Sequence, residues 1–127
     1  EPNDSPSQAP LMASGTHTIL GTLIEKASGA GDLDLWKVEL PVGATLTATT
    51  RAPCGSGSLN TFVAIANAAL EVVEGDTLPD EAFGAVSFTA DATSNGTLYL
   101  AVADEGYLAG GSPTNGSYVL EVTITVP

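Results

Sequence analysis

Apolar and polar residues alternate in short runs along the chain, and Gly, Pro, Asn and Ser separate the runs. Alternation of this kind is typical of strands that bury one face, and it differs from the 3.6-residue period of a helix. The pattern predicts strands over residues 16–24, 35–40, 45–50, 61–67, 70–73, 85–90, 97–103 and 117–126. About eight such strands fit an all-β fold, a two-sheet antiparallel β-sandwich of the jelly-roll type.

The last predicted strand shows the alternation most clearly. One of its faces carries Tyr118, Leu120, Val122, Ile124 and Val126, while the other face is mostly polar. Successive side chains of a strand point to opposite sides of the sheet, so this apolar face is predicted to lie in the core. The strand that begins at Leu35 alternates in the same way and is predicted to bury Trp36.

The length and charge of the chain limit the number of domains it can form and the classes of partner it can bind. A chain of 127 residues forms one domain, with a core that needs no metal or disulfide. A net charge of -12, with Lys26, Lys37 and Arg51 as its basic residues, argues against nucleic acids and anionic membranes as partners. Such acidity suits an extracellular protein, a high-salt habitat or a cation binder. No run of about 18 apolar residues predicts a membrane-spanning helix.

Oxygen-bearing side chains gather in two short motifs near the start of the chain. The first is Glu1-Pro2-Asn3-Asp4, and the second is Gly31-Asp32-Leu33-Asp34, which we place in the loop before the Trp36 strand. Calcium takes about 6 to 8 oxygen ligands, so two segments that meet around one ion could nearly complete its shell. The alternative is that Asn3-Asp4-Ser5 forms a turn and Asp32 caps a loop. In the calcium interpretation, residues 1–15 are a lead segment that the ion anchors to the sandwich.

The same motifs resemble those of a known family. The opening Glu1-Pro-Asn-Asp-Ser5, the Gly21-Thr-Leu23 strand and the Asp32-x-Asp34-x-Trp36 motif are similar to the bacterial pre-peptidase C-terminal (PPC) domain. Later landmarks follow in the family's order: a strand-Gly-strand hairpin at 40–46, a central strand at 63–65, an aromatic strand at 96–102 and a closing strand at 116–120. The resemblance covers essentially the whole chain, which is therefore treated as a single PPC-like domain over residues 1–127.

The resemblance implies a structure and a metal. PPC domains are small β-sandwiches appended to secreted peptidases and other exported proteins, and they are similar to the collagen-binding domains of clostridial collagenases. Those relatives bind calcium where the leading linker meets the sandwich. Transferred residue by residue, the resemblance implies that the calcium ligands are Glu1, Asn3, Asp4, Asp32 and Asp34. Asn60 stands where the family often has Asp, so a second ion is not expected there.

The sequence predicts that the protein is not an enzyme. His17 is the sole histidine, and no Gly-x-Ser-x-Gly motif supports a serine nucleophile. Neighbouring carboxylates at Asp80-Glu81 and Asp104-Glu105 are interpreted as solvated loop residues rather than a hydrolytic pair. Cys54, the only cysteine, cannot form an internal disulfide and is interpreted as a loop residue.

Three functions remain open at this stage. The leading one is a calcium-binding, non-catalytic extracellular module that stabilises, tethers or targets an exported protein. A second is a module for collagen-like peptide or polysaccharide, with Tyr107 and Leu108 as its candidate contacts. A third is a self-assembling surface or filament subunit, in which strand exchange between copies and calcium would cooperate. Asn95-Gly96 and Asn115-Gly116 match both a glycosylation pattern and a turn, and we favour the turn.

Overall fold

The predicted strands are present in the structure. A computed structural model describes residues 9–23, 33–51, 61–69, 71–75, 84–104 and 116–127. Its strands are β1 (Gly15–Leu23), β2 (Leu33–Leu40), β3 (Thr45–Arg51), β4 (Thr61–Ala66), β5 (Val72–Glu74), β6 (Ala85–Thr89), β7 (Gly96–Asp104) and β8 (Gly116–Thr125). Most boundaries differ from the predicted ones by one or two residues, and no helix lies within the described ranges.

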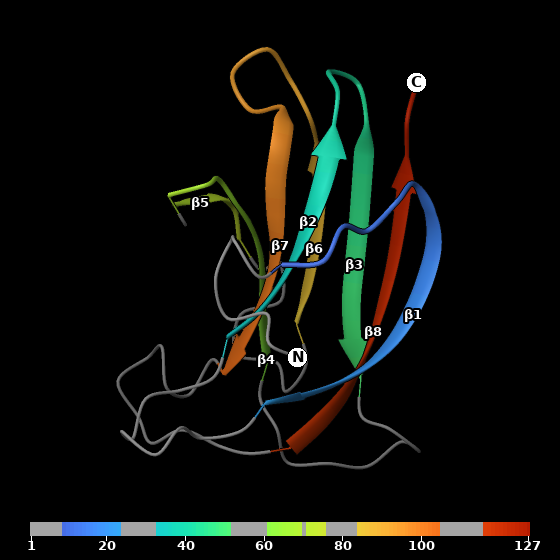
Figure 1. Ribbon diagram of the computed structural model, residues 1–127, viewed down its shortest axis with the longest axis vertical. Helices are drawn as coiled ribbons and strands as arrows, with labels where there is room; N and C mark the ends of the chain where they lie inside the picture. Colours follow the sequence, from blue (N-terminus) through green and yellow to red (C-terminus); the bar gives the residue numbers. More distant parts are fainter. Residues whose placement is uncertain (1–8, 24–32, 52–60, 70, 76–83, 105–115) are drawn as a thin grey trace.

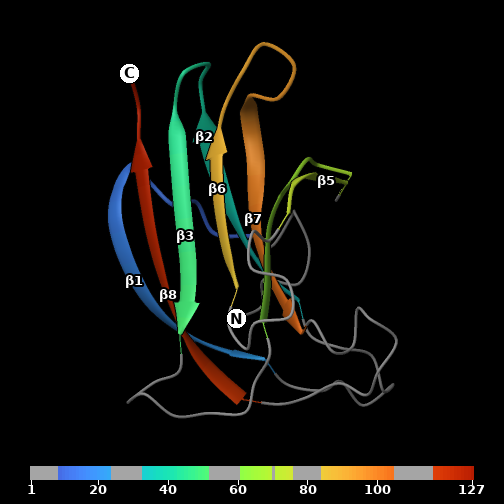
Figure 2. The ribbon, with the colours of Figure 1, turned by 180° about the vertical axis from the view of Figure 1, so that it is seen from behind.

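The strands form two four-stranded antiparallel sheets that pack face to face (Figures 1 and 2). The first sheet has the order β1-β8-β3-β6, and the second has the order β2-β7-β4-β5. The first and last strands therefore both belong to the first sheet, in which β8 pairs with β1 on one side and β3 on the other. This alternation of strands between two sheets is a jelly-roll arrangement, as the sequence predicted.

The connection between β2 and β3 corrects one expectation. The sequence predicts a hairpin over 40–46, but β2 and β3 belong to different sheets, so the turn arches between the layers. The Ala44 amide donates to the Pro41 carbonyl at 2.9 Å, and Gly43 has a φ of 92°. Alternation alone cannot distinguish strands that pair from strands that stack, because in both arrangements one face of each strand is buried.

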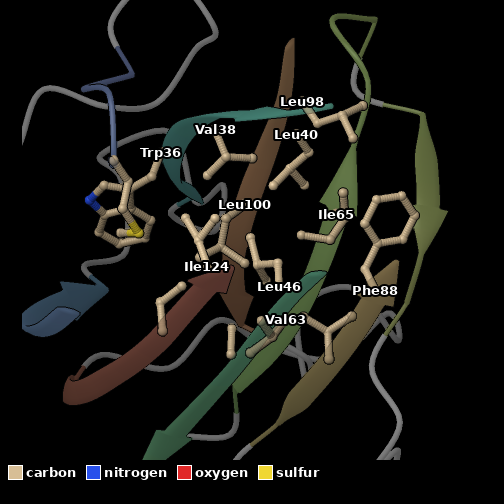
Figure 3. Packing of buried hydrophobic residues seen from close by; sticks show 14 of the residues in the cluster. Trp36, Val38, Leu40, Leu46, Val63, Ile65, Phe88, Leu98, Leu100 and Ile124 are labelled. Carbon is tan, nitrogen blue, oxygen red and sulfur yellow. The ribbon is translucent and has the colours of Figure 1, made fainter. Parts of the chain in front are cut away.

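The core lies between the two sheets. Figure 3 shows Val38 and Leu40 of β2 and Leu100 of β7 in the cluster that also contains Leu46 of β3. These four side chains have no exposed surface. Burial of one such side chain contributes about 1.5–3 kcal/mol, so the alternating strands supply most of the stability of the sandwich.

The two outer faces of the sandwich differ. On the second sheet, side chains that alternate with the core residues are also buried: Leu35, Ala64, Ala66, Tyr99 and Ala103. On the first sheet, the residues that alternate with the core are exposed along the described parts of β3 and β8, apart from the half-buried Val119. The prediction of one core face and one mostly wet face, made for the last strand, is therefore right for β8. On β2 the predicted alternation holds from Trp36 to Leu40, where Lys37 is half-buried and Glu39 is exposed, while Leu35 before them is buried on the outer face.

Candidate metal centre

Asp34 is the one predicted metal ligand that the structure describes, and its placement corrects the sequence interpretation. The sequence predicts it in the loop before the Trp36 strand, but it belongs to β2 and pairs with Val102 of β7. Because it is two residues from Trp36, it faces the same side of the sheet, toward the interior. Its residue surface is only 2% exposed. A carboxylate at this depth requires polar partners, because burial without them costs several kcal/mol.

Tyr118 of β8 supplies one of those partners. Its hydroxyl donates a hydrogen bond of 2.5 Å to Oδ2 of Asp34, although the two residues lie 84 positions apart in the chain. The Tyr118 side chain is fully buried, as the alternation of the last strand predicted. The bond connects the two sheets, because Asp34 belongs to β2 and Tyr118 to β8. This bond from the opposite sheet fixes the orientation of the Asp34 carboxylate, which is the candidate metal ligand.

Gly21 makes room for that aromatic ring. In the β1–β8 register Gly21 lies directly opposite Tyr118. A Cβ atom at Gly21 would overlap the ring and the hydroxyl of Tyr118. Glycine within a strand often marks such a close approach. Three strands therefore form the surroundings of Asp34. Strand β2 carries Asp34 itself, β8 carries Tyr118, and β1 contributes Gly21, whose missing side chain leaves space for the ring.

The lead segment is attached to the outer edge of β2. The Met12 amide donates to the Lys37 carbonyl, and the Lys37 amide donates to the Pro10 carbonyl, both at 2.8 Å. These bonds form a parallel bridge between Leu11 and Lys37, and the Met12 side chain is buried in the core. Figure 1 shows this segment crossing β2 before the chain turns into β1. Because the bridge is parallel, its N-terminal end points along β2 toward Asp34.

The remaining predicted site residues lie outside the described residues. These are the metal candidates Glu1, Asn3, Asp4 and Asp32, the contact candidates Tyr107 and Leu108, and also Cys54 and Asn115. Within the described ranges, no three His, Cys, Asp or Glu side chains gather closely enough to hold a metal ion. The structure thus gives the surroundings of one candidate ligand and the direction of residues 10–12, which follow the segment that would carry three others.

A buried hydroxyl pair closes the sandwich where β3 ends and β4 begins. The Oγ1 atoms of Thr50 and Thr61 lie 2.6 Å apart, and both residues are buried. The Gly84 amide, which precedes β6, donates to both of these oxygens, at 3.0 and 3.2 Å. On β4, Thr61 lies two positions before Val63, which pairs with Val102 of β7. Val102 also pairs with Asp34, on the other side of β7. The hydroxyl pair therefore stabilises the same end of the sandwich as Asp34.

Asp91 organises the connection between β6 and β7. Its Oδ1 accepts hydrogen bonds from the Thr93 amide, the Thr93 hydroxyl and the Ser94 amide at 2.8–2.9 Å. These donors, the Thr93 hydroxyl first, lower the pKa of Asp91 from its usual 3.8. Asn95 donates to the Asp91 carbonyl at 2.8 Å, and Gly96 follows with a φ of 85°. Residues 91–95 thus form a bend and Gly96 begins β7, so this connection joins strands of different sheets and is not the hairpin turn that the Asn-Gly pattern favours.

Replacement of Asp91 by Asn is expected to reduce the acid sensitivity of the protein. Because the folded pKa lies below 3.8, the folded state binds fewer protons than the unfolded state. The bonds to the carboxylate therefore contribute stability above the unfolded pKa, and that stability is lost as the pH falls through the folded pKa. Urea unfolding midpoints from about pH 5 to about pH 2 should fall more steeply for the native protein than for Asp91→Asn. A difference between the two proteins that is the same at every pH would contradict this.

His17 lies on β1, as predicted, and its Nε2 is 2.6 Å from the Ala13 carbonyl oxygen. The histidine thus supports the bend between the lead segment and β1. In the part of the chain that the structure describes, no helix is long and apolar enough to span a membrane.

Comparison with known proteins supports the fold. No protein-family model matches the sequence, and no curated protein matches it. The structure is similar to the pre-peptidase C-terminal domain of a Bacillus anthracis collagenase, with a TM-score of 0.56 and 16% identity over 97% of this chain and 100% of that one. It is also similar to a periplasmic inhibitor of g-type lysozyme from Aeromonas hydrophila, with a TM-score of 0.59 and 14% identity over 92% of this chain and 99% of that one. The predicted PPC-like fold is therefore confirmed.

Proposed function

We propose that this chain is a calcium-binding, non-catalytic β-sandwich module that stabilises, tethers or targets an exported protein at or outside the cell surface. The proposal rests on one feature of the structure, the parallel bridge that directs the lead segment along β2 toward the buried Asp34. Glu1, Asn3, Asp4 and Asp32 would join Asp34 around the ion. All five carry hard oxygen donors, which is the ligand type that calcium prefers.

Chain length permits this arrangement. Lys37 lies three positions after Asp34 on β2, a distance of about 10 Å in a strand. Pro10 lies six positions after Asp4, and an extended segment of that length reaches about 20 Å. The first motif can therefore reach the start of β2 with length to spare. The bridge pairs Leu11 with Lys37 of the same chain, so the first motif needs no second copy to reach the proposed site.

The similar proteins agree with a non-catalytic role. One is a domain appended to a collagenase, and the other is described as an inhibitor of a lysozyme. The lysozyme inhibitor is periplasmic, which supports an exported location for this chain. The other similar protein is one domain of a collagenase, and the inhibitor acts on a lysozyme, so a protein partner is proposed as well. The acidic surface, with its net charge of -12, suits both the location and the cation.

Calcium is expected to raise the melting temperature. At a free concentration 100-fold above the dissociation constant, one bound ion stabilises the folded state by about 2.7 kcal/mol. Calorimetry in calcium and in EGTA measures this difference. Asp4→Asn should remove most of it without a change in the core, whereas Glu74→Gln, at an exposed position on β5, should retain it. The same melting temperature in both buffers for the native chain would refute the calcium site.

A further inference from the structure

Strand β1 is an open edge of the first sheet. It stands at one end of the order β1-β8-β3-β6 and, among the described strands, pairs with β8 alone. Figures 1 and 2 both show it as the outermost ribbon of its sheet. In an antiparallel pair, about half of the N–H and C=O groups of each strand point away from the partner. Strand β1 therefore presents a row of main-chain donors and acceptors to a strand that lies beside it.

The other three edges of the sandwich are protected in ways that β1 is not. Strand β2 is bridged by the lead segment, β5 has three residues and a register shift where it pairs with β4, and β6 has five residues. Strand β1 has nine residues, GTHTILGTL, which pair with β8 without a register shift and include no proline, carboxylate, lysine or arginine. Short length, coverage, bulges and charged side chains are the usual protections of an edge strand. Of the described edges, β1 is therefore the most open to pairing.

The inner face of β1 is also less covered than that of the other edge strand in its sheet. On β6, Val86 and Phe88 are only 2% and 7% exposed. On β1, Ile19 packs against the core but remains partly exposed, and His17 on the same face is half-buried. On the outer face of β1, Leu20 is 69% exposed. A further strand beside β1 would cover the remaining apolar surface on both faces.

Charge points to a second copy of this chain as the occupant. Two chains of net charge -12 repel each other unless the surfaces that meet are free of carboxylates, and β1 is such a surface. The carboxylate that pairs beside it, Glu121 of β8, already lies 3.4 Å from Nε of Arg51. A basic partner would find no acidic side chain on β1 to recognise. The neutral edge thus suits a neutral edge, which a second β1 supplies.

We infer that β1 pairs antiparallel with β1 of a second copy, so that two first sheets join into one continuous sheet. A two-fold axis perpendicular to the sheet generates this pairing, and it brings core-facing residues opposite core-facing residues. The interface is closed, so association stops at the dimer. A single pair of edge strands belongs to the small class of interfaces, under about 1,200 Å² in total, which is typical of weak complexes. The pairing uses none of the five proposed calcium ligands.

Analytical ultracentrifugation of the whole chain in EGTA tests the inference. The native chain should pass from monomer to dimer between about 1 μM and about 1 mM. Leu20→Glu should weaken the dimer at least about tenfold, because it removes exposed apolar surface and places two like charges near the two-fold axis. Thr16→Glu, at another exposed position on β1, repeats the test if Leu20→Glu lowers the melting temperature.

Val42→Glu is the matched control for Leu20→Glu. Val42 lies in the turn between β2 and β3 and is 56% exposed, so the change removes a comparable apolar side chain and adds the same charge away from β1. The dissociation constant of this variant should equal that of the native chain. Hydrogen exchange then locates the interface: amides of β1 should exchange more slowly at high than at low protein concentration, and amides of β6 should not change.

Several results would overturn the inference. One is a native chain that remains monomeric over the whole concentration range. Another is an equal weakening by Leu20→Glu and Val42→Glu, which would attribute association to charge or apolar surface in general. A third is slower exchange on β6 together with growth beyond the dimer, which would indicate a head-to-tail contact that propagates into a filament. The measurements are made in EGTA, so they leave the proposed metal site to its own test.

Discussion

Replacement of Gly21 by Ala is expected to lower the free energy of unfolding by about 3 kcal/mol, at the upper end of the usual cost of overpacking. The added methyl group would overlap the ring of Tyr118, which is fully buried. The ring cannot move away easily, because its hydroxyl is bonded to Asp34 and its backbone is paired with Gly21 itself. Urea unfolding in EGTA measures the loss without any contribution from a bound ion.

Gly75→Ala is the matched control for Gly21→Ala. A Cβ atom at Gly75 would lie 3.7 Å from Phe62 and 3.9 Å from Val72, which are ordinary contact distances. The control should therefore change stability by less than about 1 kcal/mol in either direction. The substitution Tyr118→Leu removes the atoms that clash, so the cost of Gly21→Ala should largely vanish in that background. If Gly21→Ala costs the same in the native and the Tyr118→Leu backgrounds, this double-mutant cycle would show that the ring is not responsible.

The core could be predicted from the sequence because it depends on local alternation. Tyr118, Leu120, Val122 and Ile124 all lie on the buried face of β8, as their spacing indicates, whereas Val126, predicted on the same face, follows the end of β8 and is 45% exposed. Strand positions follow from the same signal, since each strand is bounded by turn residues that the sequence displays. The least accurate prediction concerns β5, which begins at Val72 rather than at residue 70 and has only three residues. A strand that short has too few positions to show a period.

The assignment of strands to sheets could not be predicted in the same way. The segment 40–46 contains Gly43 between two alternating strands, which is also how a hairpin looks in sequence. Whether the second strand pairs with the first or crosses to the other layer depends on contacts with β7 and β8, far along the chain. The burial of the outer face of the second sheet could not be predicted for the same reason. Ala64 and Ala66 are small residues, and their burial depends on which other parts of the chain pack over them.

The sequence misplaces Asp34 because its neighbours give the wrong local signal. The glycines at 29 and 31 predict a loop, and an acidic residue at the interior face of a strand contradicts the usual pattern. The structure resolves the conflict through Tyr118, which donates to the carboxylate from the other sheet. That partner is 84 positions away and belongs to the other sheet, so the pair becomes visible only when the packing of the two sheets is known. The position of Gly21 opposite the ring has the same long-range cause.

Removal of the Tyr118 hydroxyl alone should also be costly. Tyr118→Phe retains the ring and deletes a donor to a carboxylate that is only 2% exposed, where solvent water has little access. Hydrogen bonds to charged groups contribute about 1.5–3 kcal/mol, and the loss of one donor to a buried carboxylate is at the upper end of that range, so a loss of about 3 kcal/mol in EGTA is expected. Chemical denaturation of the native and variant proteins at pH 7 measures it.

Tyr99→Phe controls for the loss of a phenolic hydroxyl in a buried ring. Tyr99 is 6% exposed and alternates with the core residues Leu98 and Leu100, so it lies on the opposite face of the sheet from Asp34 and the same change should cost clearly less there. Equal losses at the two tyrosines would show that the bond to Asp34 contributes no more to stability than an ordinary phenolic hydroxyl.

The pair of variants also tests the proposed metal site. If Asp34 is a calcium ligand, Tyr118 orients it, and removal of such an outer partner weakens metal affinity by roughly 10- to 100-fold. Calcium titrations should then separate Tyr118→Phe from Tyr99→Phe, whereas indistinguishable affinities would mean that Asp34 supports the sandwich without binding the ion.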